Sequence, residues 1–223
     1  TDMLVLEFTI DDNLIATNRN DNPWLSRAAQ SLAETLRLAA SKKLDVEFTE
    51  LVTGYRLRTG SEASYVDIYL YDSLSSGAGY AVSVANAIAE LLADMKKLLS
   101  SCDCGSACSK CLKHYRNQHV HGMLDRFAAL QLLEWGVDGI KASPIKPEIQ
   151  INMIMPLANI LKQSGCEIVA DSEITAIGRR STKKVVIYPA MWVEPHATNT
   201  IFVSDAYIKY AKPYAVQKIL DNI

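Results

Sequence analysis

The chain lacks the features of a membrane-spanning or secreted protein. Its 223 residues contain no run of about 18 apolar side chains, because residues such as Asp94 and Asn152 interrupt the apolar stretches. Its first residues have neither the basic start nor the small-residue cleavage site of a secretory signal. We therefore expect no membrane partner and a cytoplasmic location. An initiator methionine is missing too, and the chain starts directly on a strand-like pattern, which suggests a piece of a longer protein.

An excess of basic residues is also missing. The chain has 23 Lys and Arg residues against 25 Asp and Glu residues, which gives a formal net charge of −2. This balance excludes proteins that wrap nucleic acid by charge alone, so any contact with nucleic acid must be local. There is no internal repeat and no low-complexity tract. A composition of 49% hydrophobic and 22% charged residues is typical of a globular chain with one large or two small cores.

The hydrophobic pattern predicts an α/β fold of the α+β type, a mixed sheet with flanking helices. The expected elements of the first part are a buried strand at residues 4–9, a helix opened by Pro23, strands at 44–52 and 65–71, a long helix after Gly79, and a helix at 124–135. On the first helix, apolar residues recur every three or four positions. We expect this stripe to be buried, with Arg27, Glu34 and Arg37 in water.

The composition changes after Gly136, where Pro144 and Pro147 mark a linker. The pattern beyond it predicts a helix at residues 148–163, strands near Glu167, Val185 and Ile201, and a final helix. We therefore predict two domains. The first is expected at residues 1–136, and the second, a small α/β domain of unknown role, at residues 137–223.

Four of the five cysteines lie within ten positions, with the spacing C-x-C-x3-C-x2-C: Cys102, Cys104, Cys108 and Cys111. Where thiols stay reduced, such spacing favours a metal site. Four thiolates can surround a zinc ion tetrahedrally, and a loop containing Gly105 can bend enough to deliver them. Zinc is the expected cofactor, and an iron–sulfur cluster, disulfides or plain buried thiols are the alternatives. Four sulfurs leave no position for water, so we expect a structural zinc knuckle between two helices and no catalytic residue.

Other residues near the knuckle have more than one interpretation. His114 is close enough in sequence to compete as a zinc ligand. Cys166 lies in a different segment and is expected to be a buried core thiol. A basic cluster follows the cysteines. Its cations either neutralise the negative charge of a four-thiolate zinc site or bind nucleic-acid phosphates, with neighbouring side chains contacting bases. The candidate nucleic-acid-binding residues are Lys110, Lys113, Tyr115, Arg116, Asn117, Gln118, His119 and Arg126.

A glycine-containing loop, Gly77-Ala78-Gly79, joins a strand to a helix, where backbone N–H groups can hold a phosphate. It lacks both the P-loop ending and the dinucleotide-binding pattern. A tight turn capped by Asp72 or Ser73 is the expected alternative.

Charged residues in the last part of the chain suggest a metal-dependent nuclease, whose sites gather two acids and a lysine around magnesium. The candidates are Asp171, Glu173, Lys183 and Lys184. No acid precedes Lys184 by two positions, so exposed turn charges are the expected explanation. His196 has no nucleophile partner nearby and is expected to be a loop residue.

Several segments follow one another in a distinctive order: Ile68–Asp72, Gly77–Tyr80, the four cysteines, Tyr115–Gln118 and Leu124–Arg126. Together they resemble the cysteine-rich domain that closes superfamily 2 DNA helicases of the mitomycin repair factor A type, with relatives in phage-defence systems such as DISARM. The resemblance covers about residues 60–135, with weaker support back to residue 1. It implies that the first domain, residues 1–136, is a helicase-associated zinc-binding domain. It implies a zinc-binding module, with the four cysteines as ligands, that completes an ATP-driven DNA motor in repair or antiviral defence and helps to hold or guide DNA.

The chain departs from this family at Ser76, where relatives commonly have a glycine. No P-loop, acidic helicase motif or arginine finger is visible, so we expect this chain alone not to hydrolyse ATP. Its expected partners are DNA and a helicase motor domain or subunit. Two other functions stay open: a zinc-organised interaction module that docks a motor subunit, and a nuclease in residues 137–223.

Overall fold

The computed structural model describes residues 2–17, 22–60, 63–74 and 77–223. They divide into two compact units, which are described separately. The first unit holds residues up to Asp12 and Leu25–Lys141, and the second holds Asn13–Trp24 and Ala142–Ile223. The chain therefore leaves the first unit after Asp12 and returns to it at Leu25. The domain boundary at residue 136 stays a prediction.

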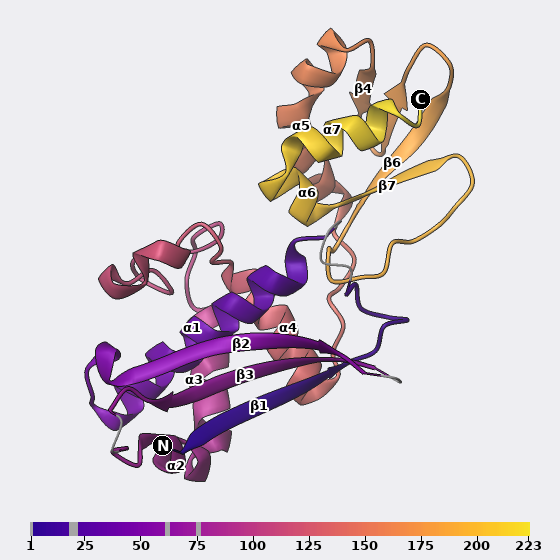
Figure 1. The fold of residues 1–223 in the computed structure, drawn as a ribbon. Helices are drawn as coiled ribbons and strands as arrows, with labels where there is room; N and C mark the ends of the chain where they lie inside the picture. Colours follow the sequence, from indigo (N-terminus) through magenta and orange to yellow (C-terminus); the bar gives the residue numbers. More distant parts are fainter. Residues whose placement is uncertain (1, 18–21, 61–62, 75–76) are drawn as a thin grey trace. The chain divides into compact units, whose positions relative to one another are not determined.

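A three-stranded antiparallel sheet forms one layer of the first unit (Figure 1). Its strands are β1 (Met3–Ile10), β2 (Leu51–Thr59) and β3 (Ser64–Asp72), in the order β1-β3-β2. The expected burial of residues 4–9 is wrong in part, because Phe8 is buried but Val5 is 45% exposed. The strand expected at residues 44–52 is also wrong, since the first helix continues to Leu44 and a short 3₁₀ helix, Phe48–Glu50, precedes β2.

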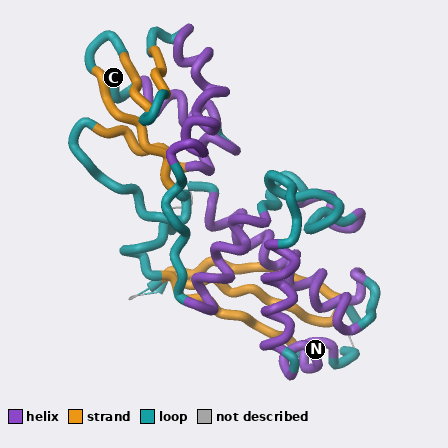
Figure 2. The backbone as a smooth tube through the Cα atoms, turned by 180° about the vertical axis from the view of Figure 1, so that it is seen from behind, coloured by secondary structure: helices purple, strands orange, loops and turns teal. Residues whose placement is uncertain are grey.

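The helices of the first unit lie on one face of this sheet (Figures 1 and 2). They are α1 (Trp24–Leu44), α2 (Tyr80–Asn86), α3 (Ile88–Ser100) and α4 (Arg126–Asp138). The long helix expected after Gly79 is split at Ala87, whose φ of −112° and ψ of 23° leave the helical region. Fully buried side chains between helices and sheet include Leu32, Leu36, Ile68, Leu70, Leu91, Met95 and Leu99.

The opposite face of the sheet carries an ion-pair network. Asp67 on β3 is 3% exposed, and its carboxylate accepts hydrogen bonds from Arg56 and Arg58 of β2. The register places Asp67 opposite Arg56, so the charges meet across neighbouring strands. Arg58 also pairs with Glu7 of β1. The network therefore joins all three strands.

The second unit is a mixed four-stranded sheet covered by helices (Figure 1). Its elements are α5 (Pro147–Gln163), β4 (Glu167–Ala170), β5 (Ile174–Ile177), β6 (Thr182–Tyr188), β7 (Thr200–Ser204), α6 (Asp205–Tyr210) and α7 (Lys212–Leu220). Strand order is β4-β5-β6-β7, and only the β6–β7 pair is parallel. The sequence pattern missed β5 and merged α6 with α7. Cys166 is confirmed as a core thiol: it is fully buried, and burial raises its pKa.

The two sheets with their helices confirm the predicted α/β class. Among the residues described, no helix is both long enough and apolar enough to cross a membrane.

Candidate metal centre

The structure brings the four clustered cysteines together at the end of α3. Their sulfur atoms all lie within 4.8 Å of one another. The Sγ–Sγ distance is 3.6 Å for Cys102–Cys108 and for Cys104–Cys111, and 3.9 Å for Cys108–Cys111. A disulfide requires a sulfur–sulfur distance of about 2.05 Å, so these cysteines are not bridged.

These distances suit one tetrahedral ion. Four sulfurs at about 2.3 Å from a zinc ion lie about 3.8 Å from one another, which matches the observed spacing. A multi-iron cluster would place several atoms between the thiolates and hold them farther apart. Within the described part of the chain, no histidine or carboxylate joins the sulfur group. The predicted competition from His114 is not supported, because its ring stacks on Phe48 with the centroids 4.5 Å apart.

Backbone N–H groups of the cysteine loop donate hydrogen bonds to two of the four sulfurs. The Lys110 N–H donates to the Cys108 sulfur over 3.4 Å and lowers the pKa of that thiol to about 7. The Cys108 N–H donates to the Cys111 sulfur over 3.2 Å, but burial raises the pKa of Cys111 to about 12. Thiols must lose their protons to bind zinc, so binding releases protons and draws on these backbone hydrogen bonds.

Arg126, at the start of α4, holds the cysteine loop through hydrogen bonds to backbone carbonyls. Its guanidinium donates to the Cys104 carbonyl through Nε at 3.0 Å and Nη2 at 2.9 Å, and to the Leu99 carbonyl through Nη1 at 2.9 Å. The Ser106 carbonyl accepts from the Arg126 N–H at 3.0 Å. Leu99 lies in the last turn of α3, so Arg126 supplies a donor to a helix-end carbonyl and fixes the loop at the same time.

A second set of buried polar contacts fastens the residues after the knuckle to α1. The Asn117 side chain donates to the Glu34 carboxylate at 2.8 Å and to the Leu112 carbonyl at 2.9 Å. The Asp125 N–H donates to the Ser31 hydroxyl at 2.8 Å, and the Asp125 side chain caps α4. Every residue from Ser31 to Leu36 is therefore buried. The expectation that Glu34 faces water is wrong, because the knuckle segment covers that side of α1.

Burial separates the candidate nucleic-acid contacts into two groups. Arg126 is 6% exposed and Asn117 is fully buried, so neither can reach a phosphate or a base, and these two predictions are corrected. Their hydrogen bonds to carbonyls and to Glu34 give them a structural role instead. The remaining candidates reach the surface: Lys113 is half-buried, and Lys110, Tyr115, Arg116, Gln118 and His119 are exposed.

The glycine-containing loop before α2 is not a phosphate site. The Asp72 carboxylate accepts from the N–H groups of Ala78 at 2.5 Å, Gly79 at 2.8 Å, Tyr80 at 3.2 Å and Ala81 at 3.1 Å. The anion expected at this helix start is thus a side chain of the protein itself, and the alternative of a turn capped by Asp72 is confirmed. The departure at Ser76 lies outside the described residues.

The acidic residues of the second unit do not form a metal site. Glu173, directly before β5, pairs with Lys184 of β6 at 2.5 Å on the surface. Among the described residues, the four cysteines are the only group of three or more possible ligands. The nuclease candidates therefore lack the convergent carboxylates that hold magnesium.

A closed group of four thiols, delivered by the end of one helix and held by the start of another, defines a structural zinc-binding domain. Residues 25–112 match the family model of the MrfA Zn-binding domain, and this stretch contains all four cysteines. This part of the chain is therefore similar to the MrfA Zn-binding domain, and its cofactor is zinc. The resemblance predicted from the sequence is confirmed.

Two longer proteins are similar to the chain. Druantia protein DruE of Escherichia coli (strain UMEA 4076-1) is 32% identical over 214 residues, which cover 92% of this chain and 12% of DruE. The crystal structure of the DUF1998 helicase MrfA bound to DNA aligns with 50% of this chain and 14% of that chain, at a TM-score of 0.40 and 19% identity. The chain thus spans a small fraction of the length of each.

Proposed function

We propose that the chain is the zinc-binding accessory module of an ATP-dependent DNA helicase, in repair or in phage defence, and that it contacts DNA beside the knuckle. The observation that carries the proposal is the exposure of Tyr115 (76%) next to Arg116 on a 3₁₀ helix, Tyr115–Val120. Buried Asn117 anchors this helix from within. An exposed aromatic ring beside exposed cations is the combination that binds single-stranded nucleic acid by stacking and charge.

The basic side chains of the same segment favour contact with phosphates over neutralisation of the charge of the zinc site. The side chains of Lys110, Lys113 and Arg116 make no hydrogen bond or ion pair with the described part of the chain. The hydrogen bonds to sulfur come from backbone N–H groups. These three cations are therefore available to a polyanion, and a local cluster of this kind is compatible with the net charge of −2.

Titration of a labelled single-stranded oligonucleotide with the zinc-loaded chain, followed by fluorescence anisotropy at several salt concentrations, tests the proposal. Each phosphate contact contributes about 0.7 to the slope of log affinity against log salt. Replacing Lys110, Lys113 and Arg116 by Gln should lower the slope by about 2. Tyr115→Ala should weaken binding by about 1–3 kcal/mol with an unchanged slope.

The control is Lys184→Gln, which removes one positive charge from a lysine that is already paired with Glu173 in the second unit. We expect it to leave affinity and slope unchanged. A triple variant that binds with the wild-type slope would contradict DNA contact at this segment.

A second candidate function is docking of a helicase motor subunit by the zinc-organised surface. The near-neutral net charge favours it, and exposed Tyr115 suits a protein interface because tyrosine is enriched there. This function requires that the chain bind a purified motor subunit, that Tyr115→Ala weaken this complex, and that no DNA bind at low salt.

A further inference from the structure

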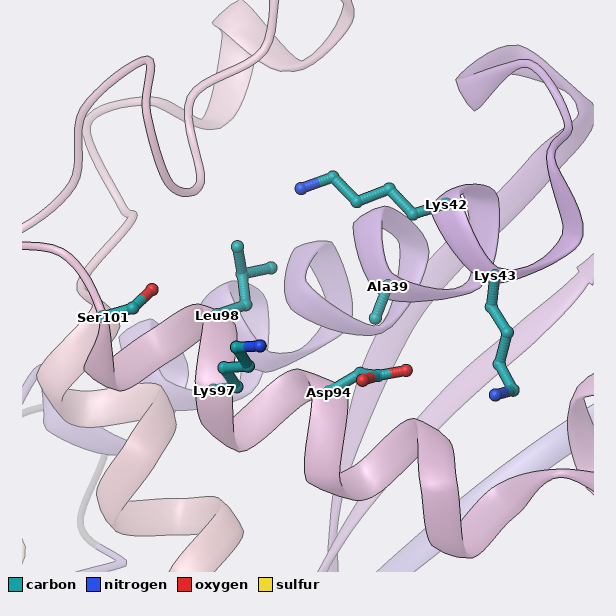
Figure 3. Close-up of a pocket in the computed structure, with 7 residues that line it drawn as sticks. All are labelled: Ala39, Lys42, Lys43, Asp94, Lys97, Leu98 and Ser101. Atoms are coloured by element: carbon teal, nitrogen blue, oxygen red, sulfur yellow. The ribbon is translucent and has the colours of Figure 1, made fainter.

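A groove runs between the last turns of α1 and α3, and the function proposed above leaves it without a role. Its volume is about 370 Å³, and Figure 3 shows the side chains that line it. The lining residues are Ala39, Lys42, Lys43, Asp94, Lys97, Leu98 and Ser101. Ala39 and Leu98 supply apolar walls, while the other lining side chains are polar or charged. The groove therefore combines an apolar surface with several ionisable groups.

Two of the lysines at these helix ends are already neutralised. Lys43 pairs with Glu90 at 2.5 Å, and this hydrogen bond raises the pKa of Lys43. Lys96 pairs with Glu134 at 3.3 Å and with Asp138 at 3.2 Å. The Asp94 carboxylate points to the Lys43 side of the groove (Figure 3), and its charge also raises the pKa of Lys43.

The other two lysines, Lys42 and Lys97, form no hydrogen bond or ion pair with the described residues, and both line the groove. Lys42 extends from α1 towards Leu98 on the opposite wall (Figure 3). Ser101 adds a hydroxyl at the same end of α3. Two ammonium groups without a partner among the described residues, a hydroxyl and an apolar wall are groups that contact the phosphates and sugars of a nucleic-acid backbone.

The groove also adjoins the knuckle. Ser101 lines the groove and is followed directly by Cys102, so their Cα atoms are about 3.8 Å apart. The sulfurs of the cluster lie within 4.8 Å of one another. A nucleic-acid strand in contact with the basic segment beyond Cys108 can therefore reach the groove within a few nucleotides.

We propose that this groove is a second binding site for the nucleic-acid backbone, in which Lys42 and Lys97 contact phosphodiester groups. The inference rests on the DNA contact proposed above and extends it to a surface outside the cysteine loop. Lys43 and Lys96 act differently: their charges are satisfied within the protein, and they hold helices together.

The test compares two double variants of the full zinc-loaded chain in the anisotropy assay with single-stranded DNA. Replacing Lys42 and Lys97 by Gln removes two phosphate contacts, so the salt slope should fall by about 1.4 and affinity at 0.1 M salt should fall about 25-fold. Replacing Lys43 and Lys96 by Gln changes the net charge equally but removes paired lysines. This control should change the slope by less than half as much.

Three results would overturn the inference. If the variant at Lys42 and Lys97 keeps the wild-type slope while the variant at Lys110, Lys113 and Arg116 loses slope, the groove is not a DNA site and the proposed function stands. A lower melting temperature with the wild-type slope would assign the two lysines to their helix C-terminal dipoles instead. Absence of salt-dependent binding by the unmodified chain would refute both the groove and the proposed function.

Discussion

Replacement of Arg126 by Met should destabilise the zinc domain strongly, although the sequence pattern alone makes Arg126 a candidate DNA contact. Methionine keeps much of the apolar volume but donates no hydrogen bond. The change would leave the Leu99 and Cys104 carbonyls without the guanidinium donors that now lie 2.9–3.0 Å away. It would also remove the contact of the guanidinium with the Phe127 ring, whose centroid is 3.9 Å away.

The expected fall in the free energy of unfolding follows from these lost contacts. A buried carbonyl that loses its donor costs about 1–3 kcal/mol, and a partly buried cation–aromatic contact contributes about 1 kcal/mol. Removing a buried charge offsets part of this loss, because the charge no longer has to be desolvated. We therefore expect the free energy of unfolding to fall by about 3 kcal/mol. Urea unfolding of the zinc-loaded chain, followed by circular dichroism, measures this change.

A second assay follows the transfer of zinc to a chromogenic chelator. It should be faster in the variant, because Arg126 no longer holds the loop at Cys104. Arg116→Met is the matched control: Arg116 is exposed and its guanidinium has no partner among the described residues, so stability should change by less than about 0.5 kcal/mol. The reasoning is refuted if Arg126→Met behaves like this control in both assays and instead lowers the salt slope of DNA binding.

Three further perturbations address other parts of the first unit. The hydrogen bond from Arg58 lowers the pKa of Asp67 from its ordinary value of 3.8. Ionised Asp67 therefore stabilises the fold fully above about pH 4, and this stabilisation is lost as pH falls through the pKa of Asp67 in the folded protein. Asp67→Asn should therefore flatten the decline of unfolding free energy below about pH 4, measured by urea titration across pH. Asp72→Ala removes the acceptor of four backbone N–H groups and should cost about 2 kcal/mol in the same titration at pH 7. Chelation of zinc should abolish protection from hydrogen exchange at residues 102–125 and leave residues 167–203 of the second unit protected.

A specific result would contradict each of these three predictions. An Asp67→Asn variant with the full acid dependence of the unmodified chain would show that other carboxylates cause the decline. If Asp72→Asn, which keeps one acceptor oxygen, is as unstable as Asp72→Ala, the loss does not come from the N–H groups. Unchanged exchange at residues 102–125 after chelation would mean that the knuckle is ordered without its metal.

Sequence patterns predicted correctly those helices and strands that depend on neighbouring residues. They failed where the outcome depends on contacts between distant segments. The helix from Pro23 and strand β3 follow from hydrophobic spacing alone, and the structure confirms both. The strand expected at residues 44–52 failed because apolar residues at Leu44, Val46 and Phe48 alternate as in a strand, while Leu44 still ends α1 and Phe48 enters a 3₁₀ helix. Spacing over a few residues cannot decide between such outcomes, which depend on the rest of the fold.

The zinc site was determined by the sequence itself. All four ligand candidates lie within ten consecutive positions, so a short loop brings them together whatever the rest of the chain does. The tertiary structure decided which neighbours support the site and which face solvent. Glu34 and Asn117 are 83 positions apart, and Ser31 and Asp125 are 94 apart, yet each pair meets under the knuckle. Only the fold shows that both sides of α1 are covered and that Asn117 turns inward to Glu34. The fold likewise buries Arg126 against the Leu99 and Cys104 carbonyls, while Tyr115 and Arg116 stay exposed.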